Sequence, residues 1–253
     1  LGAVRHQGFI PWDDDTDICM LREDYQRFLK VAPLELTGEY HINSPYSEES
    51  YNYVFSRILN ATSISYDYSR LSQFHRCPYI IGVDIFPLDT VTTNPDEESI
   101  LYQLIHILIS AVNQYDDKPE EVISMIPDLE KLCNIKLDTS RCIKNQLLRI
   151  ADSLCQIYNG SNSSFISYIP EDSQKDIRLQ REWFNTYDYL PFENILIPVP
   201  KQYDDILTAL YGDYMIPVQN CAGHDYPFYK KQTNAMAKHI TQTIMDGKKP
   251  FIF

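Results

Sequence analysis

One stretch decides how this sequence folds: Arg5-His6-Gln7-Gly8-Phe9-Ile10-Pro11-Trp12-Asp13-Asp14-Asp15-Thr16-Asp17-Ile18. Four carboxylates fall within five residues, and apolar residues stand on both sides of them. These flanks predict a partly buried strand rather than a solvated acidic turn. Side chains two positions apart share one face of a strand, so Asp13, Asp15 and Asp17 are expected to line up at intervals of ~6.7 Å. Divalent cations would neutralise this row of like charges, which predicts a metal site.

A second acid stands in a strongly apolar segment. The run from Tyr79 to Phe86 predicts a strand that Pro87 ends, and Asp84 lies inside it between Val83 and Ile85. A lone buried carboxylate is costly, so Asp84 is expected to pair with a cation, to bind a metal or to lie at an open strand end. An Asp-x-Asp pair and a lone Asp on two strands can cradle two metal ions for phosphoryl chemistry.

The rest of the pattern predicts an α+β fold, a mixed β-sheet core with an inserted helical segment. Residues 1–18 are expected to form a strand and a turn before the acidic strand, and a helix follows until Pro33 stops it. Helical periodicity covers about 95–115, 119–132 and 139–158. Strand-like sequence covers 183–199, and a short helix at 200–210 ends at Gly212. We expect one domain over 1–253, with its core at 1–90 and 176–230 and its helical segment at 91–175.

Composition excludes several classes of protein. The 253 residues are 44% hydrophobic, which is enough for a sizeable core and excludes a disordered chain. The net charge of −13 opposes general attraction to nucleic acid, so no nucleic acid partner is expected. No apolar run approaches the ~20 residues that span a bilayer. The six cysteines form no C-x-x-C pair, which favours reduced thiols in a cytoplasmic protein.

These motifs resemble the LicD family. The resemblance covers about 5–89 and 183–217, and it rests on residues 1–17, on Met20-x-Arg22-x-Asp24-Tyr25-x-x-Phe28, on Asp84-Ile85-Phe86-Pro87-Leu88-Asp89 and on Tyr211-Gly212-Asp213. The family is similar in fold to nucleotidyltransferases. Its bacterial members transfer phosphocholine from CDP-choline to cell-surface glycans, and relatives of the fukutin type transfer ribitol phosphate from CDP-ribitol.

The resemblance implies roles for four acids. Asp15 and Asp17 correspond to the Asp-x-Asp metal ligands, Asp84 to the third carboxylate, and Asp13 to an accessory acid. The implied cofactor is Mg²⁺ or Mn²⁺, and the implied catalytic residues are Asp15, Asp17 and Asp84. The superfamily also has a Gly-Ser or Gly-Thr turn that would lie ahead of Leu1, so we expect the natural chain to begin upstream.

Three basic residues are expected to contact substrate phosphate. Arg5 and His6 directly precede the acidic stretch, and Arg57 resembles a basic position of the family. For Arg5 and His6 a structural role is an equally good interpretation, because Arg pairs with nearby carboxylates and His can orient an Asp. For Arg57 an ordinary surface position is the slightly favoured interpretation. The pair His224-Asp225 is more typical of a local hydrogen bond than of a catalytic dyad.

The predicted function is metal-dependent transfer of a phosphoalcohol group to a hydroxyl of a cell-surface glycan precursor, with release of CMP. The expected donor is a CDP-alcohol, most simply CDP-choline, and the expected acceptor is a glycan or lipid-linked glycan such as a lipopolysaccharide or teichoic acid precursor. Two alternatives stay open: a nucleotidyltransferase that uses the same metal site, and a non-catalytic binding or scaffold subunit. A cytoplasmic protein with peripheral contact to the membrane is expected, although no basic amphipathic helix is recognised in the sequence.

Overall fold

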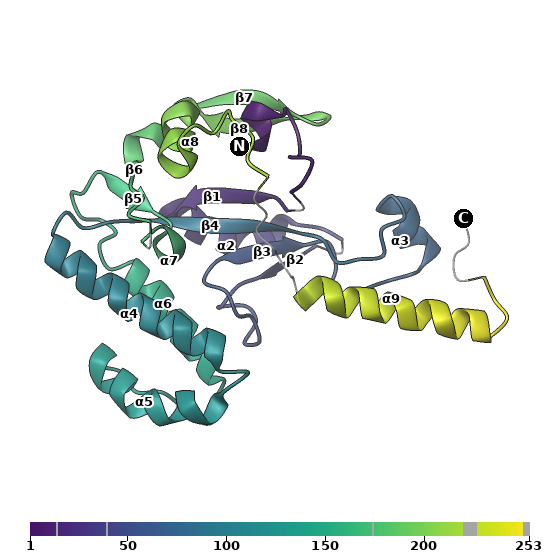
Figure 1. Cartoon of the computed structure of the whole chain (residues 1–253), viewed down its shortest axis with the longest axis horizontal. Coiled ribbons are helices and arrows are strands. Elements are labelled where there is room, and N and C mark those ends of the chain that lie inside the picture. Colours follow the sequence, from purple (N-terminus) through teal and green to yellow (C-terminus); the bar gives the residue numbers. More distant parts are fainter. Residues whose placement is uncertain (14, 39, 174, 220–226, 250–253) are drawn as a thin grey trace.

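A computed structural model describes residues 1–13, 15–38, 40–173, 175–219 and 227–249, with side chains in 227–233 not described. Its centre is a six-stranded mixed sheet, which confirms the predicted α+β class. The strands are β1 (Asp17–Leu21), β2 (His41–Asn43), β3 (Ser56–Leu59), β4 (Gly82–Thr90), β5 (Phe165–Ser167) and β6 (Leu179–Gln180). Figure 1 shows this sheet between a hairpin with a short helix on one side and a group of long helices on the other.

Strand β4 organises the sheet. It pairs in parallel with β1 along one edge, and along the other edge it pairs antiparallel first with β3 and then with β5. The prediction that Pro87 ends this strand is wrong. The Asp84 N–H points to Thr16 on the β1 side, so the odd-numbered positions face the other edge. Along that edge, pairing with β3 reaches only as far as Ile85, and pairing with β5 starts only at Asp89. Pro87 lies in the gap between them, so the N–H that it lacks would have had no partner strand.

The N-terminal segment differs from the strand that was expected. Residues Gly2–Arg5 form α1, a single helical turn, and the next strand begins only at Asp17. The turn closes tightly because Gly2 leaves room for it: a β-carbon on Gly2 would lie 2.5 Å from the Gly8 carbonyl oxygen. Asp13 and Asp15 therefore precede β1 instead of lying on one face with Asp17 along a strand.

Helix α2 (Arg22–Glu35) follows β1 directly. Pro33 was expected to stop it, but the helix continues for two residues beyond Pro33 before Leu36 leaves the helical region. Pro33 cannot donate to the carbonyl of Leu29, so the helix carries one missing hydrogen bond before it ends.

The helical segment agrees with the periodicity of the sequence. It contains α4 (Pro95–Gln114), α5 (Pro119–Cys133) and α6 (Ile143–Cys155), and the Asn94 side chain caps α4 by accepting from two backbone N–H groups. The segment is not wholly helical, because β5 returns to the central sheet before the short helix α7 (Ile169–Asp172). The main core joins α4, α5 and α6 to the sheet through Leu108, Leu147, Leu148, Leu88 and Ile166.

The chain from residue 181 returns to the N-terminal segment. After the 3₁₀ helix η1 (Arg181–Phe184), β7 (Tyr187–Phe192) and β8 (Ile195–Pro200) form a separate hairpin, and α8 (Tyr203–Tyr211) ends at Gly212 as predicted. Phe9 packs edge-on against Phe192, and its N–H donates to the Glu193 carboxylate at 3.0 Å. The two regions that carry the family motifs thus pack on each other.

Two helices lie away from this body. Figure 1 shows α3 (Tyr68–Gln73) and α9 (Pro227–Met245) side by side on an arm that extends from the edge of the sheet carrying β2 and β3. The sequence analysis predicted neither helix. In the described part of the chain, no helix is both long enough and apolar enough to cross a membrane.

Candidate active site

Polar side chains form a row across four neighbouring strands. Asp17 of β1 lies opposite Asp84 of β4, Asp84 lies opposite Arg57 of β3, and Arg57 lies opposite Asn43 of β2. Residues paired in this way lie on the same face of a sheet. The strand pairing therefore brings together Asp17, Asp84 and Arg57, three residues that the sequence analysis singled out from separate segments.

The carboxylates of the acidic stretch act on one another. Burial, together with the charges of Asp15, Asp84 and Asp13, raises the pKa of the Asp17 carboxyl to about 7. The side chain nevertheless reaches solvent, because Asp17 is exposed at the start of β1. Although Asp13 and Asp15 precede the strand, their charges are close enough to be felt at Asp17. These charges act on one another from a turn followed by a strand, and not from one face of a single strand as predicted.

Arg57 occupies both oxygens of Asp84. Its Nε and one terminal nitrogen donate to the two Asp84 oxygens in a bidentate ion pair. The guanidinium lies 5.5 Å from the centre of the Tyr53 ring, and the side chain runs past Gly82. A β-carbon at Gly82 would lie 2.8 Å from Arg57 Cγ and 2.8 Å from Leu59, so this glycine makes room for the pair.

Two further residues act on or respond to Asp17: Glu171, to which no signal in the sequence analysis pointed, and Tyr211, which the sequence analysis quoted only as part of a motif. Glu171 of α7 contributes to the raised pKa of Asp17. Partial desolvation and the charges of Cys19 and Asp17 raise the pKa of Tyr211, so the electrostatic influence of the acidic group reaches the end of α8. Tyr211 belongs to the Tyr-Gly-Asp motif, so the structure brings this distant motif to the start of β1.

Arg5 and His6 lie in the N-terminal segment. Arg5 donates to the Tyr214 carbonyl oxygen at 2.6 Å and to His6 Nδ1 at 3.3 Å, and His6 packs edge-on against Trp12. These contacts tie α1 to the turn after α8. Contact of Arg5 and His6 with substrate remains a prediction, and His224 and Asp225 lie outside the described residues.

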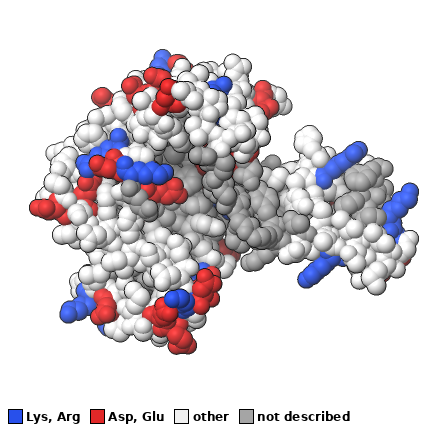
Figure 2. All heavy atoms as spheres, in the orientation of Figure 1, with Lys and Arg blue, Asp and Glu red and all other residues white. Residues whose placement is uncertain are grey.

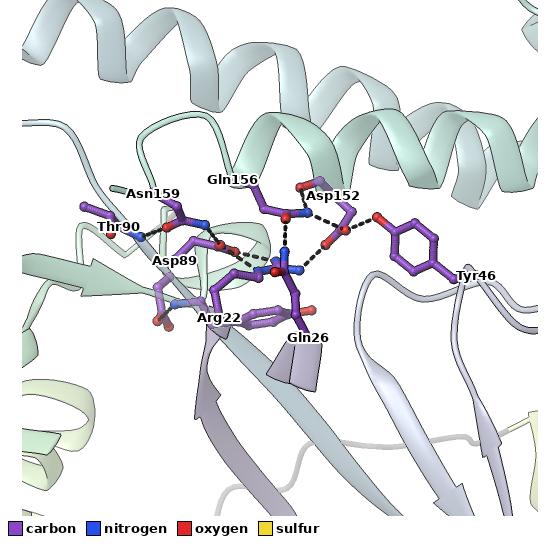
Figure 3. Close-up of polar contacts among 10 residues, drawn as sticks. Arg22, Gln26, Tyr46, Asp89, Thr90, Asp152, Gln156 and Asn159 are labelled. Atoms are coloured by element: carbon purple, nitrogen blue, oxygen red, sulfur yellow. Dashed lines mark hydrogen bonds and ion pairs between the residues drawn. The ribbon is translucent and has the colours of Figure 1, made fainter. Parts of the chain in front are cut away.

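A second polar group lies at the other end of β1 and β4. Arg22 and Asp89, both part of the quoted motifs, pair through contacts of 2.8 and 2.5 Å, and Arg22 also contacts Asp152 of α6 at 2.9 Å. Figure 3 shows Arg22 between the two acids, with Asn159 donating to Asp89 and Tyr46 to Asp152. Arg22, Asp89 and Asp152 are 4%, 1% and 2% exposed, so this group is a buried link between α2, β4 and α6.

A polar cavity of about 510 Å³ opens beside this network, with Gln26, Thr90, Gln156 and Asn159 among its lining residues. Because Arg22 follows β1 and Asp17 begins it, the cavity lies roughly 16 Å along the strand from the carboxylates. It contains none of the residues that the sequence analysis predicted for chemistry.

The acidic group fits a hard divalent cation in its donor chemistry. Carboxylate oxygens are the ligands that Mg²⁺ and Mn²⁺ prefer, and the raised pKa of Asp17 shows unneutralised negative charge at this point. Within the described residues, however, no three His, Cys, Asp or Glu side chains are grouped to hold a metal. The two bonds from Arg57 occupy Asp84, so coordination by Asp84 requires this ion pair to open.

Comparison with known proteins gives a consistent result. A family model described as LicD/FKTN/FKRP, nucleotidyltransferase domain, matches residues 1–102. The chain is 30% identical over 231 residues to the lipopolysaccharide cholinephosphotransferase LicD of Haemophilus influenzae, which covers 85% of this chain and 78% of that protein. Uncharacterized proteins of Rickettsia typhi and Rickettsia prowazekii are 58% and 54% identical over 33 residues, or 13% of this chain and 11% and 12% of those proteins. No solved structure matches the chain.

Proposed function

The chain belongs to the LicD family and is a phosphotransferase of the LicD type, and from this premise we propose that it transfers phosphocholine from CDP-choline to a hydroxyl of a lipopolysaccharide glycan precursor, releasing CMP. One observation carries the proposal: the similarity to a lipopolysaccharide cholinephosphotransferase extends over 85% of the chain. The row of polar residues across β1, β4 and β3 supports it.

Asp15 and Asp17 are the proposed ligands of Mg²⁺ or Mn²⁺, with Asp13 as an accessory acid and Asp84 as the third carboxylate. The cation would supply positive charge to the pyrophosphate of the donor and to the departing CMP. In its absence the acids repel one another, as the raised pKa of Asp17 indicates. This repulsion is the reason that a cation is expected here.

Arg57 and Asp84 are proposed to act as a pair. Arg57 presents a planar guanidinium to donor phosphate, which is the geometry that suits two phosphate oxygens. Asp84 holds Arg57 in the substrate-free protein and accepts the proton of the attacking acceptor hydroxyl at one of its carboxylate oxygens. Arg5 and His6 are further proposed contacts for phosphate at the edge of the site.

A scan of nucleotide donors tests the proposal. The full chain is incubated with Mg²⁺, an acceptor lipopolysaccharide and CDP-choline, CDP-ribitol or CDP-glycerol, and both CMP and the modified acceptor are measured. We expect CMP and choline-labelled acceptor from CDP-choline. Release of pyrophosphate from CTP would support a nucleotidyltransferase, and absence of both binding and turnover with all donors would support a non-catalytic subunit.

A cytoplasmic location with peripheral contact to the membrane completes the proposal, because a lipid-linked acceptor is presented at a membrane surface. The donor, a soluble nucleotide, would reach the carboxylates from the aqueous side.

A further inference from the structure

Charge is distributed unevenly between the two ends of this acidic chain. Residues 227–253 hold five of the 22 Lys and Arg residues but one of the 35 acids, so this end carries +4 and residues 1–226 carry −17. In Figure 2 acidic groups are spread over the body, whereas the arm shows basic side chains with little acidic surface beside them. The arm is therefore a cationic projection from an anionic protein.

One face of α9 fixes the helix to the rest of the arm. His239 stacks on Tyr66 with ring centroids 3.8 Å apart, and the Tyr79 hydroxyl lies 3.3 Å from the sulfur of Met236. Half-buried positions recur at 236, 239, 240 and 243, the spacing of one helical stripe. The opposite face of the helix consequently points to solvent.

We define the α9 patch as Lys238 and Met245 on that outer face, Ile244 at its margin, and Lys248 and Lys249 just beyond the helix. All five are exposed, Ile244 at 58% and Met245 at 76%. Lys238 and Met245 are seven residues apart and so lie on the same side of the helix. The patch thus combines cations with apolar side chains that nothing in the described part of the chain covers.

We propose that the α9 patch docks on an anionic lipid surface. Lys side chains attract acidic headgroups, and exposed Ile and Met side chains suit the boundary between headgroups and acyl chains. The strongly negative body is repelled by the same surface, so the arm is the part of the molecule that charge favours for contact. This inference names the surface for the peripheral contact suggested above, and in that respect it rests on the proposed function.

The charge complementarity also fixes how the protein would lie. Because the arm extends from the β2–β3 edge of the sheet (Figure 1), docking through α9 would hold the lipid surface at the arm and leave the carboxylates of the body open to water. A soluble nucleotide could then reach the acidic group while the arm holds the protein near a lipid-linked acceptor.

Vesicle sedimentation tests the inference with the full chain. We expect binding to vesicles of phosphatidylcholine and phosphatidylserine, weakened by salt, and little binding to phosphatidylcholine alone. The charge-reversal variant Lys238→Glu/Lys248→Glu/Lys249→Glu should bind roughly 100-fold or more weakly, since each Lys near an anionic surface contributes about fivefold. The control Lys118→Glu/Lys131→Glu/Lys136→Glu has the same net charge, with its changes at and beside α5, and should bind nearly as well as the unaltered protein.

Three results would overturn the inference: equal binding to neutral vesicles, equal loss of binding in the α5 control, or unchanged binding after reversal at the α9 patch. Circular dichroism of both variants checks that they fold. The outcome is separable from the proposed function. Choline transfer to a soluble, lipid-free acceptor without vesicle binding would contradict this inference alone, whereas vesicle binding without transfer would contradict the proposed function alone.

Discussion

At the scale of single residues, Asp17 shows how a functional group opposes stability. Its carboxyl has a pKa of about 7 in the folded chain and 3.8 in the reference state, because burial and four neighbouring acids disfavour its charge. Between these values the folded protein binds more protons than the unfolded chain, so the free energy of unfolding falls as the pH rises from about 4 to about 7. The ionised form that a cation needs is the form that destabilises the metal-free fold.

The substitution Asp17→Asn separates these two effects. We expect a higher melting temperature than the wild type at pH 8, and a difference that shrinks as the pH is lowered towards ~4, because the variant has no charge to repel. Phosphocholine transfer should fall by ~100-fold or more if Asp17 is, as proposed, a ligand of the catalytic cation. Melting curves of both proteins without metal, recorded across pH, measure the first effect. A lower melting temperature for the variant at pH 8 would contradict the assigned repulsion.

Arg57 is expected to compete with the cation for Asp84. The substitution Arg57→Met should free both Asp84 oxygens and so raise the affinity for Mn²⁺, while donor binding falls because a phosphate contact is lost. Titration calorimetry with Mn²⁺ and with CDP-choline measures both changes. Arg5→Met removes a positive charge from the N-terminal segment, where Arg5 contacts the Tyr214 carbonyl oxygen and His6, and it should leave Mn²⁺ affinity nearly unchanged. Weaker Mn²⁺ binding to the Arg57 variant would show that the pair helps to form the metal site.

At the scale of elements, Arg22 joins three of them. The guanidinium bridges Asp89 of β4 and Asp152 of α6, and all three side chains are buried. The motif that ends at Asp89 and the motif that contains Arg22 thus share a structural role. Sequence alone could not show this, since two Asp residues in similar apolar segments give the same signal whether they face a metal or an arginine.

Arg22→Met should lower the free energy of unfolding by about 3–5 kcal/mol, because it leaves two buried acids without their cation. Arg141→Ala removes an exposed pair with Glu49 and should cost less than about 1 kcal/mol. Urea denaturation of the two variants makes the comparison. If the Arg22 and Arg141 variants both lost the same small amount of unfolding free energy, the buried group would not be the link between α2, β4 and α6.

Element prediction from the sequence succeeded where local signals were strong. The Asn94-Pro95 start predicted α4, Gly212 ended α8, and the apolar run around Asp84 predicted β4. It failed where tertiary context overrode a local rule. Pro87 lies between two partner strands, Pro33 lies in the last turn of α2, and glycine contacts close α1 into a helical turn.

At the scale of the whole molecule, motifs far apart in the sequence meet at the start of β1. Asp17 and Asp84 pair across the strands, Arg57 follows on the next strand, and Tyr211 arrives from α8. The grouping of Asp17 and Asp84 was predictable from their strand patterns. The Arg57–Asp84 pairing and the approach of Glu171 were not, because they depend on sheet register and on a return of the chain from the helical segment.

The arm with α9 was also missed from the sequence. Its half-buried stripe contains His239 and Thr243 beside Met236 and Ile240, so the apolar periodicity of this helix is weak. The uneven distribution of charge is visible only once the last residues are counted separately from the body.

The most direct test of the central claim measures the rate of CMP release from CDP-choline in the presence of Mg²⁺ and acceptor. The variants are Asp15→Asn and Asp84→Asn, and Asp128→Asn on α5 is the matched control. If the acids at the start of β1 and β4 form the catalytic site, the first two variants lose at least ~100-fold in rate and the control keeps the wild-type rate. Near-normal CMP release by Asp15→Asn or Asp84→Asn, from protein that is folded by circular dichroism, would contradict the account.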